Sequence, residues 1–88
     1  MLDSSSASQQ PVEGASAAPA WRAEVYLTDR EIETIWLLSD GLLYKEIADR
    51  MGVSLATAKF HVANVLKKLK ARTATHAVSI AFRKGIVS

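Results

Sequence analysis

The run KFHVAN, residues 59–64, holds side chains whose chemistry suits the base edges of duplex DNA. Lysine donates to O6 and N7 of guanine, asparagine pairs with N6 and N7 of adenine, and an apolar ring contacts the thymine methyl group. If the run is helical, Lys59 and Ala63 form one outward ridge, and Phe60 and Asn64 form the next. Ala63 is small enough to let the backbone approach a base closely. We therefore predict that these four residues read bases.

Basic residues follow this run: Lys67, Lys68, Lys70 and Arg72. Residues 1–49 hold nine acids and three bases, whereas residues 50–88 hold eight bases and no acid. A charge distribution polarised in this way suits a polyanionic partner. We expect the four basic side chains to contact phosphates. A basic face that is merely solvated is the alternative interpretation.

Two predicted helices must position these side chains. The third helix of the chain should span about residues 55–69, with Ser54 as its N-cap. The helix before it should span about residues 44–51 and end at Gly52, where a left-handed residue is needed. Two helices joined by so short a turn containing glycine have the sequence form of a helix-turn-helix.

The remaining elements complete an all-α, four-helix domain. Thr28 and Glu31 form a capping box that starts a first helix over about residues 29–39, and a last helix should cover residues 75–84. We assign residues 21–88 to the domain and expect order to begin at Leu27. Residues 1–20, rich in Ser, Ala, Gln, Pro and Gly, indicate a disordered N-terminal leader or linker.

Several function classes lack support in the sequence. The chain has no cysteine, and His61 and His76 have no carboxylate or cysteine at ligand spacing, so we expect no metal site. We expect His61 to be a hydrogen-bonded core residue. No nucleophile–base pair or cofactor fingerprint is present, so we expect neither an enzyme nor a cofactor. No apolar run is long enough to cross a membrane and no secretory signal is evident, so we expect a cytoplasmic protein.

The motifs LTDRE (residues 27–31), KEIA (45–48) and TAKFHVAN (57–64) closely resemble the LuxR/FixJ/GerE-type DNA-binding domain. The resemblance runs from Leu27 to about Val87. It implies a domain of a bacterial transcription regulator, such as a response regulator, that binds double-stranded DNA through its third helix. It also implies phosphate contacts from Ser54, Thr57, Lys67 and Lys68, and we add Lys45 at the start of the second helix.

The same resemblance implies a homodimer formed through the last helix. The residues expected at that interface are Thr75, Val78, Ser79 and Phe82. RNA polymerase is a further possible partner. Two departures from the family pattern matter. Leu43 and Tyr44 replace a polar pair that often touches the DNA backbone, and Ala74 replaces a frequent arginine, which removes one possible partner of Glu31.

A protein-interaction module is the main alternative from another class. In that interpretation the domain dimerises with a larger regulator and modulates it, and Ile32 and Trp36 supply an exposed apolar surface. Packing of Trp36 against Trp21 or Tyr26 is the plainer expectation. A sigma-factor region of similar architecture fits the LTDRE and KEIA motifs less well.

Overall fold

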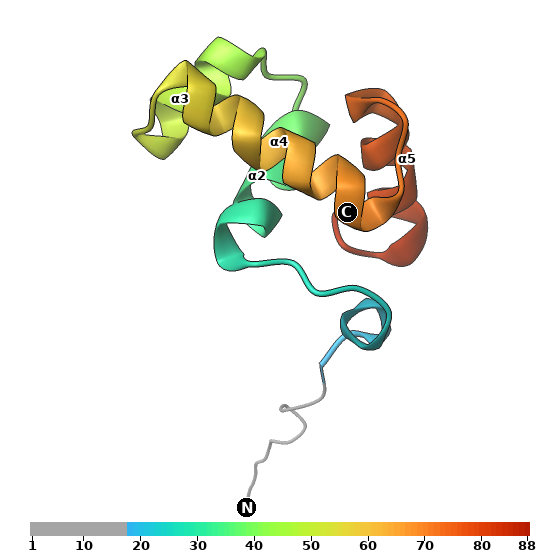
Figure 1. Ribbon diagram of the computed structural model, residues 1–88. Helices are drawn as coiled ribbons and strands as arrows, with labels where there is room; N and C mark the ends of the chain where they lie inside the picture. Colours follow the sequence, from blue (N-terminus) through green and yellow to red (C-terminus); the bar gives the residue numbers. More distant parts are fainter. Residues whose placement is uncertain (1–17) are drawn as a thin grey trace, which may run out of the picture.

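Four α-helices and a short 3₁₀ helix make up the part of the chain that the structure, a computed structural model, describes, residues 18–88 (Figure 1). The elements in order are η1 (Ala20–Ala23), α2 (Asp29–Ser39), α3 (Tyr44–Met51), α4 (Leu55–Leu69) and α5 (Ala74–Lys84). The all-α class is confirmed, and the predicted bounds agree except that α5 begins one residue earlier. The prediction of a disordered leader falls almost entirely on residues outside the described range.

Capping side chains explain where the helices begin. Thr28 Oγ1 accepts from the Glu31 N–H at 3.1 Å, and Glu31 Oε1 accepts from the Thr28 N–H at 2.8 Å, so the predicted capping box starts α2. Ser54 caps α4 by accepting from the Thr57 N–H at 3.1 Å. Each pair satisfies amide groups that the first helical turn leaves without partners.

Residues in the left-handed region end three helices. Gly52 has a φ of 67° and ends α3, as predicted. Lys70 ends α4 with a φ of 56° and is the only non-glycine residue with positive φ in residues 18–88. A side chain with a Cβ is strained in this conformation, so Lys70 sits where glycine would cost less.

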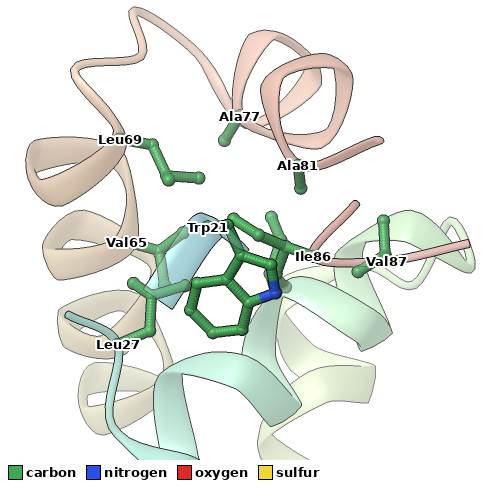
Figure 2. Close-up of a cluster of buried hydrophobic side chains, with 9 residues drawn as sticks. Trp21, Leu27, Val65, Leu69, Ala77, Ala81, Ile86 and Val87 are labelled. Carbon is green, nitrogen blue, oxygen red and sulfur yellow. The ribbon is translucent and has the colours of Figure 1, made fainter. Parts of the chain in front are cut away.

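The larger core cluster forms around an indole from the N-terminal segment. Trp21 is only 5% exposed and lies among side chains of α4, α5 and the C-terminal residues (Figure 2). Its neighbours in the cluster are Leu27, Ile35, Val65, Leu69, Ala77, Ala81, Ile86 and Val87. The expectation that order begins at Leu27 is therefore wrong, because the domain closes its core only with a residue from η1.

A second cluster sets the crossing of α3 and α4. Ile47, Ala48, Met51 and Ala58 are all buried, and Leu37, Leu38, Leu42, Tyr44 and Val53 pack around them. Ala48 and Ala58 have short side chains, so the two helix backbones can approach closely where they cross. This crossing sets how α3 packs against α4.

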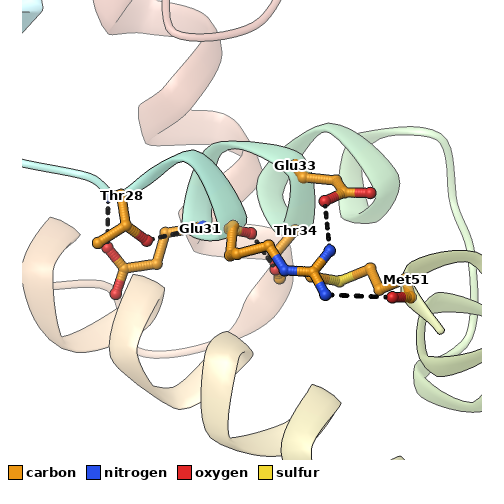
Figure 3. A network of polar contacts seen from close by, with 6 residues as sticks. Thr28, Glu31, Glu33, Thr34 and Met51 are labelled. Carbon is orange, nitrogen blue, oxygen red and sulfur yellow. Dashed lines mark hydrogen bonds and ion pairs between the residues drawn. The ribbon is translucent and has the colours of Figure 1, made fainter. Parts of the chain in front are cut away.

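A polar contact from α2 reaches the end of α3. The Arg30 guanidinium donates to the Met51 carbonyl at 3.2 Å and to Glu33 Oε1 at 3.0 Å (Figure 3). Because Met51 ends α3, its carbonyl has no partner within the helix. Arg30 supplies that partner and ties α2 to the end of α3. This role of Arg30 was not predicted from the sequence.

Candidate nucleic-acid interface

The outward face of α4 presents most of the predicted base-reading side chains to solvent. Phe60 is 63% exposed, Lys59 and Ala63 are exposed, and Asn64 is half-buried. The opposite face of the helix is the buried stripe Ala58, Val62, Val65 and Leu69. Successive residues of an α-helix are about 100° apart, so Lys67 falls between the two outward ridges, and it too is exposed.

His61 departs from its prediction. It is half-buried, and the edge of the Phe60 ring packs near it, with ring centroids 6.1 Å apart. On the helix it lies about 70° away from the centre of the buried stripe, which places it at the edge of the core. The expectation that His61 is buried in the core is therefore wrong. Its ring instead lies beside the ring of Phe60.

The N-terminus of α4 carries two hydroxyl groups side by side. Ser54 Oγ donates to Thr57 Oγ1 at 3.0 Å and is exposed, while Thr57 is half-buried. The amide ends of an α-helix bear partial positive charge, so hydroxyl groups placed here suit an anionic oxygen. Lys45 is exposed in the first turn of α3, the other helix of the motif.

Lys68 lies apart from the other lysines of α4. Its ammonium donates to Glu31 Oε1 at 2.7 Å and lies 5.2 Å from the centroid of the Tyr26 ring. Lys68 is about 110° from the middle of the outward face, so it reaches α2 rather than the surface of Phe60 and Lys59. The predicted contact of Lys68 with phosphate stays a prediction, but its ammonium turns toward Glu31, so we leave Lys68 out of the proposed interface.

Glu31 is a nearly buried carboxylate, 4% exposed, that receives two hydrogen bonds. Burial by itself raises the pKa of this group. The bonds from the Lys68 ammonium and the Thr28 amide outweigh that effect, and the pKa of Glu31 lies below its ordinary value of 4.5. The charged pair thus ties α4 to the first turn of α2.

The turn between α4 and α5 presents the last two predicted phosphate contacts. Lys70 and Arg72 are both exposed there. The Arg72 N–H donates to Nδ1 of His76, on the first turn of α5, at 3.0 Å. The sequence analysis assigned no role to His76. Its position three residues after the N-cap Thr73 is the signal that could have indicated one, because capping-box side chains occupy that position.

The four residues predicted for a dimer lie along one side of α5. Thr75 is exposed, Val78 and Ser79 are half-buried, and Phe82 is 50% exposed. Thr75 and Val78 also line a groove of about 440 Å³ between α5 and the α2–α3 connection. The other residues of its wall are Leu38, Gly41, Leu42, Leu43, Tyr44 and Ala74.

Acidic side chains stand next to this groove. Asp40, Glu46 and Asp49 line a second hollow, of about 500 Å³, which shares Gly41 and Leu42 with the first. Three acids thus lie beside the α2–α3 connection, where Arg50 also lines the hollow, whereas α4 carries no acid.

Trp36, on α2, is 39% exposed. It belongs to neither core cluster, whereas Trp21 is at the centre of one. Contrary to the expectation, Trp36 therefore does not pack into the core beside Trp21. Among residues 18–88, no group of three potential metal ligands is present and no helix is long and apolar enough to cross a membrane.

A single protein-family match covers both helices of the helix-turn-helix. Residues 25–81 match the bacterial regulatory proteins of the luxR family. The response regulator protein VraR of Staphylococcus aureus is 40% identical over 68 residues, which cover 75% of this chain and 32% of VraR. VraR of Staphylococcus epidermidis matches equally well. The chain thus spans about a third of the length of these curated relatives.

A solved structure gives the same result for the fold. The VqmA dimer of Vibrio cholerae, described as a LuxR-type receptor and determined without its target DNA, superposes with a TM-score of 0.69. The two sequences are 31% identical, and the match covers 74% of this chain and 29% of VqmA.

Proposed function

Because this chain belongs to the luxR family of bacterial regulatory proteins, we propose that it binds duplex DNA sequence-specifically and thereby regulates transcription. The observation that carries the proposal is the outward face of α4, where base-reading and phosphate-binding side chains occur together and no acid occurs. The helix has 15 residues and is therefore roughly 22 Å long. A helix of this kind fits the major groove, which is about 12 Å wide.

The base-reading roles follow from side-chain chemistry. Lys59 donates to O6 and N7 of a guanine, and Asn64 pairs with an adenine. The exposed ring of Phe60 meets a thymine methyl group, with His61 behind it. Ala63 brings the helix backbone close to the base edges, so its own contribution is limited to a methyl contact.

Phosphate contacts orient this helix on the duplex. The residues we assign are Ser54, Thr57, Lys67, Lys70, Arg72 and Lys45. The hydroxyl groups of Ser54 and Thr57 lie beside the free backbone N–H groups at the N-terminus of α4. Together these groups favour the binding of one phosphate. The four basic side chains act as point charges whose counterion release makes the affinity depend on salt.

A homodimer through α5 is the second part of the proposal. If two α5 helices pack antiparallel about an axis between Val78 and Ser79, Phe82 of one copy lies opposite Thr75 of the other. Thr75 lines the apolar groove beside the α2–α3 connection, so that groove receives the exposed Phe82 ring. Arg83 then lies opposite Ala74 of the other copy, and the acids Asp40, Glu46 and Asp49 line the neighbouring hollow. Apolar contact at the centre and opposite charges at the edge are typical of protein interfaces.

Sedimentation tests the dimer directly. We expect both variants Phe82→Ala and Leu43→Glu to weaken self-association. Phe82→Ala removes the inserted ring, and Leu43→Glu places a charge in the groove that receives this ring. Tyr26→Ala is the matched control, since Tyr26 is 72% exposed, lies beside Lys68 and does not line the groove. Equal dimer constants for the wild type and Phe82→Ala exclude this interface.

The relatives suggest the setting in which the domain works. VraR is a response regulator, and this chain matches about a third of its length. We propose that the domain is the DNA-binding part of such a regulator, and that RNA polymerase is a further partner.

Exposure of Trp36 favours a second candidate function, a protein-interaction module that dimerises with a larger regulator and modulates it. A large aromatic ring outside both core clusters is a plausible anchor for a partner. Trp36→Ala separates the two candidates. Loss of regulation with unchanged DNA affinity supports the interaction module, whereas unchanged regulation excludes Trp36 as its anchor.

Selection from a random duplex pool at two salt concentrations tests the proposed function itself. We expect enrichment of a two-fold or tandem motif with half-sites about 10 bp apart, and an affinity that falls steeply with salt. Binding without any enriched motif removes the base-reading role of α4 and leaves a basic domain whose specificity comes from a partner.

A further inference from the structure

The turn that follows α4 is fixed by hydrogen bonds along its length. The Ala71 N–H donates to the Leu66 carbonyl at 2.8 Å, which closes the C-terminus of α4 after the left-handed residue Lys70. Thr73 Oγ1 accepts from the His76 N–H at 3.0 Å and starts α5. These bonds hold the two ends of the turn.

Arg72, between these ends, is held by the imidazole of His76. Its N–H donates to Nδ1 at 3.0 Å. His76 therefore bonds the turn twice, once through its own amide and once through its ring. The ring takes the place of the carboxylate in a capping box, but it reaches the residue before the N-cap Thr73 rather than the N-cap itself. A side chain on α5 thus fixes the peptide of a basic residue after α4.

We propose that His76 is a positioning residue of the DNA interface. Its ring holds the Arg72 peptide so that the exposed guanidinium faces a phosphate beside the major groove. The inference rests on the proposed function, because it needs DNA at this side of α4. Holding the peptide in advance matters, since a long basic side chain on a free turn loses additional conformational entropy when it binds. His76 touches no base or phosphate itself.

The chemistry of the contact defines the variants that test it. The acceptor is a ring nitrogen two bonds beyond Cβ, and asparagine places its Oδ1 at the same distance along the side chain. His76→Asn therefore keeps the acceptor, whereas His76→Leu keeps the bulk and removes the acceptor. Both variants leave the charged residues of the interface in place.

DNA affinity and its salt dependence are measured for the wild type, His76→Asn, His76→Leu, Arg72→Ala and the double variant Arg72→Ala/His76→Leu. We expect His76→Leu to lose about two- to tenfold in affinity, the value of one hydrogen bond. Its salt slope should fall by up to about 0.9, the value for one phosphate contact. His76→Asn should bind within about twofold of the wild type. In the Arg72→Ala background, His76→Leu should have no further effect, because residues that act through one contact are not additive.

Amide hydrogen exchange in the free protein checks the bond without DNA. The Arg72 amide should be protected in the wild type and His76→Asn and unprotected in His76→Leu. An unprotected Arg72 amide in the wild type, or an effect of His76→Leu that persists in the Arg72→Ala background, overturns the inference. If Lys59→Ala and Lys67→Ala lower affinity while His76→Leu does not, the inference alone has failed. If none of the three lowers affinity, the proposed function has failed with it.

Discussion

Three lysines of α4 carry the same charge in different surroundings, so replacing each by alanine separates three roles within one helix. Lys59 lies on the outward face at the start of the base-reading run. Lys67 lies between the two outward ridges, about two turns after Lys59. Lys68 is bonded to the nearly buried Glu31 at 2.7 Å. Each substitution removes one positive charge, so each variant is a control for the others.

The expected magnitudes differ in kind. Lys59→Ala should cost about 1–3 kcal/mol on the preferred sequence and relax the choice at one base pair. Lys67→Ala should weaken binding to all sequences alike and lower the salt slope by about 0.9. Lys68→Ala should change DNA affinity least. It should instead lower the free energy of unfolding by about 1–3 kcal/mol, because the Glu31 carboxylate loses a charge-assisted hydrogen bond while it stays buried.

Anisotropy titrations with the selected duplex and its single-base variants, at four salt concentrations, measure the first two effects. Urea unfolding measures the third. Equal loss on all sequences for Lys59→Ala contradicts its base-reading role. A fall of the salt slope in Lys68→Ala as large as that in Lys67→Ala contradicts the division of α4 into a DNA face and a face toward α2, and restores Lys68 to the interface.

Other predictions concern stability and acid sensitivity. Trp21→Ala should lower the free energy of unfolding by about 3–5 kcal/mol, because it empties the centre of the larger core cluster, and a urea titration checks this. The lowered pKa of Glu31 stabilises the folded state above its unfolded value of 4.5, and this contribution is lost as pH falls through the lower, folded pKa. Glu31→Gln should therefore flatten the stability curve below about pH 4.5, as measured by urea unfolding at several pH values; an unchanged curve excludes Glu31 as its source. Lys70→Gly should raise the unfolding free energy by about 0.5–1 kcal/mol by relieving the left-handed backbone, yet lower the salt slope of DNA binding by about 0.9.

The helices were predictable because their signals are local. Thr28 with Glu31, Ser54 with Thr57, and Gly52 each act within one turn of chain, so the residue types alone place the ends of α2, α3 and α4. Trp21 was not predictable in this way. It precedes the periodic part of the sequence and follows a proline- and alanine-rich stretch, and only the assembled helices form the space that it fills.

His61 and Lys68 depart from the expected ridges of α4 for a single geometric reason. Residues four apart advance by about 40° around a helix, so a ridge that begins at Phe60 has turned by about 80° when it reaches Lys68. That rotation takes Lys68 to Glu31, and the corresponding rotation from the buried stripe takes His61 out of the core. Spacing at i and i+4 predicts neighbours well over one turn. Over two turns, a prediction of neighbours also requires the position of the adjacent helix, and the sequence alone does not give that position.

The small number of base-reading side chains argues that one copy of the domain is insufficient for specific binding. Lys59, Phe60 and Asn64 address about three or four base pairs, and each mismatched pair costs about 1–3 kcal/mol. A bacterial genome offers on the order of 10⁶ competing sites, and three or four base pairs recur far too often among them. Two copies joined through α5 double the number of base pairs read and double the phosphate contacts. In the proposed dimer, the exposed Phe82 and the apolar groove that it would enter contribute to sequence choice by holding two α4 helices together.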